Sequence, residues 1–208
     1  MRKQASTCIT NIMEVKILLL VMCCFFISCG EGYQKVDGKW AWVLRSEAGK
    51  HVRKLNVDQS SFKIFNNKSY AKDKKSVFFE GEKIDLADPE TFEIISDNGY
   101  AKDKNYVFIE SSIVIFASPD KFKILDWPYS RDDKKIYNGN LPMNIKNVDE
   151  FKVTKSSDER TSFMKEHFIE MHSDYKWLDT INIKGIIISK NAEASTSDEM
   201  FKGIEKLN

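Results

Sequence analysis

The sequence predicts a mainly β protein made of tandem hairpin repeats of about 30 residues, because two spacings stay constant along the chain. Aromatic residues recur in pairs whose members lie 22 residues apart: Trp40 with Phe62, Tyr70 with Phe92, Tyr100 with Phe122, and Tyr129 with Phe151. Successive pairs begin 30, 30 and 29 residues apart. A unit this small cannot bury its apolar face alone, so we expect residues 40–153 to stack as a solenoid-like or curved sheet with these eight residues in its core. An incomplete propeller is the alternative.

Within a unit, short apolar and β-branched runs separated by turn-forming residues predict strands rather than helices. In the unit that begins at Tyr100, we expect strands on both sides of a tight turn at residues 103–105, and a third strand at residues 113–116. Asp at the start of such a turn accepts hydrogen bonds from nearby backbone amides. In the next unit, Asn138 followed by Gly139 is the strongest short hairpin signal.

Each well-preserved unit then carries a signal for a single helical turn. The dipeptides are Asp-Pro at residues 88–89 and Ser-Pro at residues 118–119. A capping Asp or Ser followed by Pro at the first helical position opens a helix, so this turn is expected to swing the chain towards the next unit. It directs Phe92 and Phe122 inward, where burial of one ring stabilises the fold by roughly 1.5 to 3 kcal/mol.

These units resemble the DKNYY family of bacterial proteins, which is named for a repeated tyrosine-rich motif. The resemblance covers about residues 62–153, and its carriers are ADPETF at residues 87–92 together with Asp103, Lys104, Asn105, Tyr106 and Val107. The chain departs from the family pattern at Lys75, Ser76, Ser111, Ser112, Asp133 and Lys134. These departures weaken single turns and leave the repeat intact. The family looks like secreted or lipid-anchored proteins of unknown function, so the resemblance implies an envelope protein and lends no catalytic residues.

The N-terminus has the three regions of a signal peptide. An apolar run of 11 residues at 17–27 follows Lys16, whereas a bilayer-spanning helix needs roughly 20 residues. Residues 26–29, Phe-Ile-Ser-Cys, resemble a bacterial lipobox, at which the cysteine thiol receives a diacylglycerol and the signal is cut just before it. We therefore expect residues 1–28 to be removed and Cys29 to be lipidated. An unmodified cysteine after an ordinary secretory signal is the alternative.

The predicted signal peptide places the protein at the bacterial cell envelope. It leaves open to which membrane the protein is anchored and on which face of that membrane it lies. Translation from Met1 or from Met13 gives the same mature chain. All four cysteines lie at or before the expected cut, which excludes a disulfide framework or a thiolate metal site in the mature body. Residues 29–39 are expected to be a tether that reaches about 30 Å when extended and holds the domain close to its membrane.

The charge of the mature chain argues against nucleic acid as a partner. Removal of residues 1–28 leaves 29 basic and 30 acidic residues, which are interspersed without a block of one sign. A nucleic-acid-binding protein normally shows a basic stripe. The mature chain is long enough for one substantial core, and we expect a monomer.

The pattern changes after Val153, and residues 154–208 are expected to form a small α+β tail. Residues 156–159 resemble a capping box, and apolar residues recur at helical spacing over residues 163–171. Residues 181–189 predict a strand, and residues 196–199 are expected to cap a final helix with Met200, Phe201, Ile204 and Leu207 on one face. This tail could close the open edge of the repeat sheet.

Candidate metal and cofactor sites are weak. His167 and His172, with Glu170 between them, lie five residues apart, unlike the four-residue spacing of zinc helices. The repeated acids Asp73, Asp103 and Asp132 suit turn stabilisation better than calcium binding. Calcium needs several oxygen atoms that converge in one loop, whereas each of these acids lies in a turn next to a basic residue. We expect no metal and no cofactor.

The sequence favours binding over catalysis. It shows no nucleophile elbow, P-loop or dinucleotide fingerprint, and nothing singles out a carboxylate pair. Trp127 and Trp177 could form a surface platform for a protein or a sugar, although large aromatic side chains more often fill a core. The hypothesis is a membrane-anchored, non-catalytic module that binds a protein or a glycan, with an immunity-type lipoprotein as its sharper version. An envelope hydrolase acting on glycan or peptide is the competing class.

Overall fold

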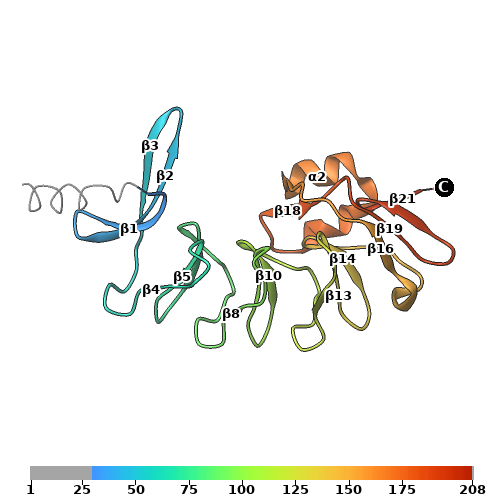
Figure 1. The fold of residues 1–208 in the computed structure, drawn as a ribbon, viewed down its shortest axis with the longest axis horizontal. Coiled ribbons are helices and arrows are strands. Elements are labelled where there is room, and N and C mark those ends of the chain that lie inside the picture. Colours follow the sequence, from blue (N-terminus) through green and yellow to red (C-terminus); the bar gives the residue numbers. More distant parts are fainter. Residues whose placement is uncertain (1–29, 208) are drawn as a thin grey trace, which may run out of the picture.

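The computed structural model describes residues 30–207, which form a row of small antiparallel sheets along a gentle arc (Figure 1). Five sheets follow one another in chain order, and a sixth, two-stranded sheet lies near the C-terminal end of the row. The predicted architecture of tandem β hairpins is confirmed, with an open row in place of a propeller. The expected signal peptide and Cys29 lie outside the described residues. Within residues 30–207, no helix is long and apolar enough to cross a bilayer.

The three middle sheets, units 2 to 4, share one design of four short strands. Unit 2 contains β4 (Lys63–Ile64), β5 (Tyr70–Lys72), β6 (Val77–Phe79) and β7 (Glu82–Lys83). Unit 3 contains β8 (Glu93–Ile94), β9 (Tyr100–Lys102), β10 (Val107–Ile109) and β11 (Ser112–Ile113). Unit 4 contains β12 (Lys123–Ile124), β13 (Tyr129–Arg131), β14 (Ile136–Asn138) and β15 (Leu141–Pro142). The strand expected at residues 113–116 is thus shorter and begins one residue earlier.

A buried aspartate organises the hairpin turn of each middle unit. In unit 3, the carboxylate atom Oδ1 of Asp103 accepts hydrogen bonds from the amides of Asn105 and Tyr106, both at 2.7 Å. Its other oxygen accepts the amide of Asp88 at 2.8 Å, which ties the hairpin to the preceding helical turn. Asp73 and Asp132 repeat these contacts in units 2 and 4. These carboxylates therefore act as turn stabilisers, as the sequence favoured.

The units are joined by a ladder of tyrosine hydroxyls. Tyr70 donates to the carbonyl of Gly99 at 2.6 Å, and Tyr100 donates to the carbonyl of Pro128 at 3.3 Å. Burial raises the pKa of both hydroxyls, so they remain protonated donors. Each tyrosine hydroxyl thus provides a hydrogen-bond donor to backbone carbonyl groups of the next unit, so that the buried hydroxyl itself has a partner.

The structure brings the members of all four aromatic pairs into contact. Ring centroids lie 4.8 Å apart for Trp40 and Phe62, 5.7 Å for Tyr70 and Phe92, 5.5 Å for Tyr100 and Phe122, and 5.2 Å for Tyr129 and Phe151. The constant spacing of 22 residues therefore corresponds to one repeated packing contact. The pairs differ in burial, because Phe92 is 4% exposed whereas Phe62 and Phe122 are only partly buried.

The first sheet, unit 1, contains β1 (Gly32–Val36), β2 (Lys39–Ser46) and β3 (Gly49–Lys54) in the order β1-β2-β3. Residues 32–36 were expected to be part of a tether, but they pair with β2 over their full length. The tether is thus reduced to the first few residues after Cys29. Tyr33 in β1 also begins the tyrosine ladder, because its hydroxyl lies 3.2 Å from the carbonyl of Ser69 and accepts the amide of Gly81 at 3.0 Å.

The last sheet, unit 5, shows that the repeat continues into the expected tail. It contains β16 (Lys152–Lys155), β19 (Glu193–Ser195), β20 (Met200–Lys202) and β21 (Glu205–Leu207). Tyr129 donates to the carbonyls of Ala192 and Gly203, as Tyr100 does to those of Pro128 and Gly139. A short 3-10 turn, η1 (Val148–Glu150), leads into this unit.

The final helix predicted from residue 196 is wrong, because these residues form the hairpin β20–β21. Thr196 takes the place of the turn aspartate: its hydroxyl accepts the amides of Asp198 and Glu199 at 3.3 and 3.1 Å. A helix N-cap makes the same hydrogen bonds to the second and third following residues. The local signal is therefore identical for a helix start and for this turn.

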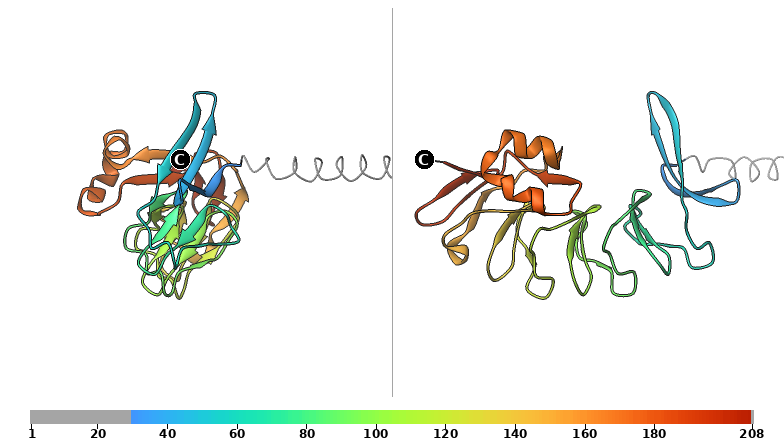
Figure 2. Two further views of the ribbon diagram at one scale, coloured as in Figure 1. Left: turned by 90° about the vertical axis from the view of Figure 1, so that its left-hand side faces the viewer. Right: turned by 180° about the vertical axis from the view of Figure 1, so that it is seen from behind.

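Unit 5 is interrupted by an insertion, residues 156–191, between β16 and β19. The insertion contains β17 (Thr161–Met164), α2 (Lys165–Met171), the 3-10 segment η2 (Ser173–Thr180) and β18 (Gly185–Ile188). The helix expected after residues 156–159 thus begins later, at Lys165, because β17 pairs first with β18. The insertion and the β2–β3 hairpin rise on the same side of the row, at opposite ends (Figures 1 and 2).

Two asparagines of unit 4 hold the insertion in place. The side-chain amide of Asn138 donates to the carbonyl of Ser189 at 2.8 Å and accepts the amide of Ser189 at 2.9 Å. Asn140 does the same with Gly185 and Ile187, at 3.0 and 2.8 Å. These side chains imitate a strand partner for β18. An apolar cluster also joins the insertion to the repeats, through Phe168, Leu178 and Ile186 on one side and Ile115 and Leu141 on the other.

Candidate functional site

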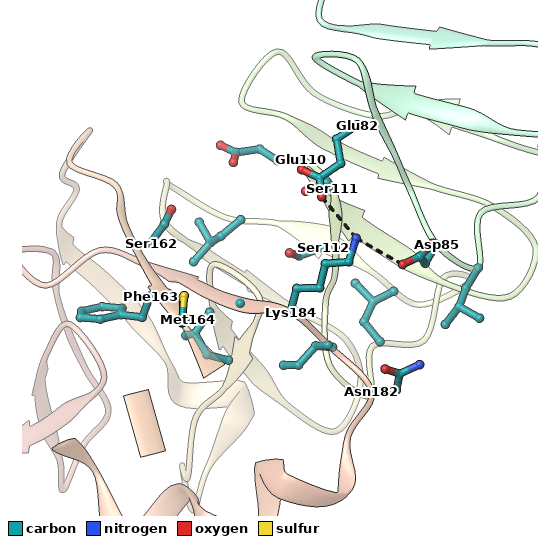
Figure 3. A pocket seen from close by; sticks show the side chains of 16 residues that line it. Glu82, Asp85, Glu110, Ser111, Ser112, Ser162, Phe163, Met164, Asn182 and Lys184 are labelled. Atoms are coloured by element: carbon teal, nitrogen blue, oxygen red, sulfur yellow. Dashed lines mark hydrogen bonds and ion pairs between the residues drawn. The ribbon is translucent and has the colours of Figure 1, made fainter. Parts of the chain in front are cut away.

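A cleft of about 410 Å³ lies where the insertion meets the hairpin turns of units 2 and 3 (Figure 3). The repeat side contributes Glu82, Asp85, Leu86, Glu110, Ser111, Ser112 and Ile113. The insertion contributes β17, β18 and the segment before β18, which includes Ile183 and Lys184. The cleft therefore has an apolar wall from the insertion and a polar floor from the turns.

Ion pairs link the insertion to units 2 and 3 across the cleft. Lys184 Nζ lies 3.2 Å from Glu82 Oε1 and 3.5 Å from Asp85 Oδ2 (Figure 3). The hydrogen bond that Lys184 donates to Glu82, and after it the charge of Asp85, raises the pKa of Lys184, so this residue stays protonated. Arg160, at the start of the insertion, pairs with Glu110 and donates to the carbonyl of Asn98 at 2.7 Å.

Two large apolar residues beside the insertion have left-handed backbone conformations. Leu86 has φ +69° and Phe116 has φ +65°, and they occupy equivalent positions 30 residues apart in units 2 and 3. Both side chains are largely exposed, with 53% and 58% of their surface accessible to solvent. A bulky residue in this conformation costs of order 1–3 kcal/mol and gains little from an exposed side chain. Such strain is typical of residues kept for contact with a partner.

Phe116 and Trp177 line a second hollow, of about 820 Å³, on the other flank of the insertion. Their rings stack at a centroid distance of 5.6 Å and an interplanar angle of 25°. Trp177 is thus partly exposed, and a role of this residue in binding a partner stays a prediction. Trp127 is not at the surface, because only 6% of its area is exposed. It packs in the core between units 3 and 4, and the Arg160 guanidinium covers its ring at 4.2 Å.

The structure separates the residues considered for metal binding. His167 Nδ1 lies 3.6 Å from Glu170 Oε2 on the exposed face of α2. His172 instead packs against the ring of Phe168, at a centroid distance of 4.6 Å. Among residues 30–207, no three His, Cys, Asp or Glu side chains gather in a group that could hold a metal ion.

The carboxylates near the cleft are arranged for ion pairing. Glu82 and Asp85 contact Lys184, and Glu110 contacts Arg160. Glu80 lies next to this group, where partial desolvation, and after it the Glu110 charge, raises its pKa. A retaining or inverting hydrolase needs a second carboxylate free to act as nucleophile or base. Because three of these four acids have cationic partners, the arrangement suits binding better than hydrolysis.

Sequence reasoning missed the cleft and its ion pairs, since residues 82–86 and Lys184 lie about 100 positions apart in the chain. The exposed apolar residues at equivalent repeat positions were visible in the sequence, as Leu86 and Phe116 each precede an Ala one residue before the Asp-Pro or Ser-Pro signal. The sequence did not show that these two side chains are exposed or that their backbone conformation is left-handed.

The fold and the cleft define a β-hairpin repeat protein with an insertion docked on its side. A model of the DKNYY family matches residues 46–170, and the chain belongs to this family. The match is wider than the resemblance at residues 62–153 and includes β3 of unit 1, all of units 2 to 4 and the first part of the insertion. Searches of curated proteins and of solved structures found no match.

Proposed function

We propose that the protein is a membrane-anchored, non-catalytic binding module of the bacterial cell envelope, and that it holds a protein partner at the cleft. The observation that carries the proposal is the set of exposed apolar side chains around the insertion. Met164 is 70% exposed and Leu86 is 53% exposed, and both line the cleft. Phe116 continues this surface on the other flank. Apolar and aromatic anchors beside paired charges are typical of protein interfaces.

The insertion gives this surface a fixed shape. Asn138 and Asn140 hold β18 on unit 4, and Lys184, just before β18, pairs with Glu82 of unit 2. A preorganised surface loses little conformational entropy when a partner binds. These contacts support a rigid receptor surface rather than a flexible loop.

The anchor is tested by replacing Cys29 with Ser. We expect the variant to fold like the wild type and to leave the membrane fraction of cells, because the lipid would be lost while all described elements remain. Fractionation followed by immunoblotting measures the change. A variant that stays in the membrane fraction would show that the signal segment is an uncleaved anchor.

The binding surface is tested by crosslinking in native envelopes, with pull-down and mass spectrometry, using wild-type protein and the variant Leu86→Asp with Met164→Asp. Both substitutions suit the fold, because Asp tolerates a left-handed backbone and Met164 occupies the N-cap position of α2. We expect one stoichiometric protein partner with the wild type and at least a tenfold loss with the variant.

The matched control is Met200→Asp, because Met200 is 58% exposed but lies on unit 5, away from the cleft. It should recover the partner like the wild type. Equal recovery by the cleft variant would refute the cleft as the binding surface. Recovery of glycan fragments in place of a protein would refute a protein partner and favour the glycan alternative.

A further inference from the structure

The second hollow, of about 820 Å³, lies where the insertion meets the segment after β11 and the hairpins of units 4 and 5. It shares no lining residue with the cleft. Its volume falls within the range of roughly 300 to 1,000 Å³ that is usual for small-molecule sites. We call it the aromatic hollow, because the rings of Phe116, Tyr175 and Trp177 line it.

Stacked rings form a flat platform in the aromatic hollow. Phe116 lies on Trp177 at an interplanar angle of 25°, and Tyr175 lies beside Trp177 at a centroid distance of 6.2 Å. The Phe116 side chain is 58% exposed, so Trp177 covers only part of it. The platform therefore offers a flat apolar surface that the ring of a ligand can cover.

Backbone contacts hold this platform in place. The carbonyl oxygen of Phe116 accepts the hydroxyl of Tyr137 at 3.3 Å. The amide of the preceding residue, Ile115, donates to the carbonyl of Asn140 at 2.9 Å. These contacts keep Phe116 in its left-handed conformation, although its exposed side chain gains little from burial. A platform that is fixed in advance loses little conformational entropy when a ligand binds.

Polar side chains line the aromatic hollow beside the platform. They are Lys135, Asn144, Asp174 and Glu205, and within the described part of the chain these four side chains make no hydrogen bond or ion pair. The amide of Asn144 both donates and accepts, the ammonium group of Lys135 donates, and the two carboxylates accept. Lys135 and Lys206 balance the charges of the two carboxylates, so the lining carries no net charge. Such a lining suits a neutral ligand that is rich in hydroxyl groups.

We propose that the aromatic hollow binds a sugar ring of a neutral oligosaccharide. A pyranose ring has a flat face of C–H groups, which packs on an aromatic ring, and hydroxyl groups around its edge, which both donate and accept hydrogen bonds. The platform and the polar side chains beside it match these two features. A stack of Phe116 on Trp177 that serves only the fold predicts no sugar binding, which separates the two explanations. The inference does not rest on the protein partner proposed for the cleft.

The test uses the chain from residue 29 onward with Cys29→Ser, which contains every described element. The probe is an array of neutral oligosaccharides built of hexoses and N-acetylhexosamines, printed beside sulfated and uronic-acid oligosaccharides. We expect binding to neutral members of the array only. The member that binds best is then titrated while tryptophan fluorescence is recorded. Phe116→Ala should weaken its affinity by about tenfold or more, because the ring supplies the apolar contact.

Trp177→Phe locates the bound sugar. This variant keeps a ring beneath Phe116, so binding should persist. The change in emission should disappear, because Trp177 is the tryptophan that lines the aromatic hollow. A change in emission that persists in this variant would place the sugar elsewhere and overturn the proposal.

The matched control is Tyr106→Ala, which removes an exposed ring of unit 3 that does not line the aromatic hollow. It should bind the sugar with the affinity of the parent, and unfolding curves check that each variant is folded. No binding to any neutral member, binding to charged members alone, or equal affinities of the parent and the Phe116 variant would each overturn the proposal. None of these outcomes bears on the protein partner, which the variant with Leu86→Asp and Met164→Asp tests separately.

Discussion

Replacing Gly139 by Ala is expected to displace the insertion and to lower the free energy of unfolding by about 3 to 5 kcal/mol. A Cβ atom at this position would lie 1.8 Å from the carbonyl oxygen of Ile187 and 2.8 Å from its carbon. Both atoms belong to the backbone of β18, so no side-chain rotation can relieve the contact. The left-handed backbone of Gly139, with φ +59°, adds about 1 to 2 kcal/mol of strain.

The displacement is measured by hydrogen exchange of residues 156–191 together with denaturant unfolding. We expect the amide of Ile187, which donates to Asn140 Oδ1 at 2.8 Å, to lose protection while the turns of unit 2 keep theirs. Gly38→Ala is the matched control, since Gly38 also has a left-handed backbone, with φ +74°, but nothing within 4 Å of the added Cβ. It should cost only the backbone strain of about 1 to 2 kcal/mol. Equal effects of the two substitutions would contradict the close docking of the insertion.

The repeat could be predicted because its signals are local or strictly periodic. The aspartate turn needs only Asp103 and the two amides that follow it, and the single helical turn needs only residues 88–92. The constant spacing of 22 residues between the two aromatic residues of each pair corresponds to a direct contact between their rings. Such contacts are short-range in sequence, so one chain without relatives is enough to reveal them.

The insertion hid the fifth unit, because it places 37 residues between the first strand of that unit and its hairpin. The segment 194–201 follows the same pattern as residues 101–108, with Thr196 in place of Asp103. Without the aspartate, the hydroxyl of Thr196 looked like a helix cap. The docking of β18 is set by two asparagine side chains, which a sequence reads as turn formers. The cleft could not be predicted, since it depends on where the insertion lies.

The insertion also explains why the cleft lies off the repeat axis. A row of hairpins offers equivalent turns along one side, and Leu86 and Phe116 are exposed at such positions. The insertion covers part of this side of the row. Leu86 lines the cleft on one flank of the insertion, and Phe116 lines the hollow on the other flank. A regular repeat thus gains an irregular surface, which is what selective recognition of one partner requires.

Replacing Phe92 by Ala is expected to cost about 3 to 5 kcal/mol and to lower the melting temperature by about 10 °C. The ring lies between units 2 and 3 and contacts Phe65, Tyr70 and Phe108, at centroid distances of 5.8, 5.7 and 5.7 Å. Its removal leaves a cavity that the stacked units cannot close without breaking the hydrogen bond from Tyr70 to Gly99. Calorimetry and denaturant unfolding measure the effect.

Two further phenylalanines make this prediction specific. Phe122→Ala should cost less than Phe92→Ala, because Phe122 is only partly buried although it has the same place in its unit. Phe116→Ala removes the same ring from a side chain that is 58% exposed, and should change the free energy of unfolding by about 0.5 kcal/mol or less. Wild-type stability of the Phe92 variant, or equal losses in all three, would refute the packing of the repeat units through these aromatic pairs.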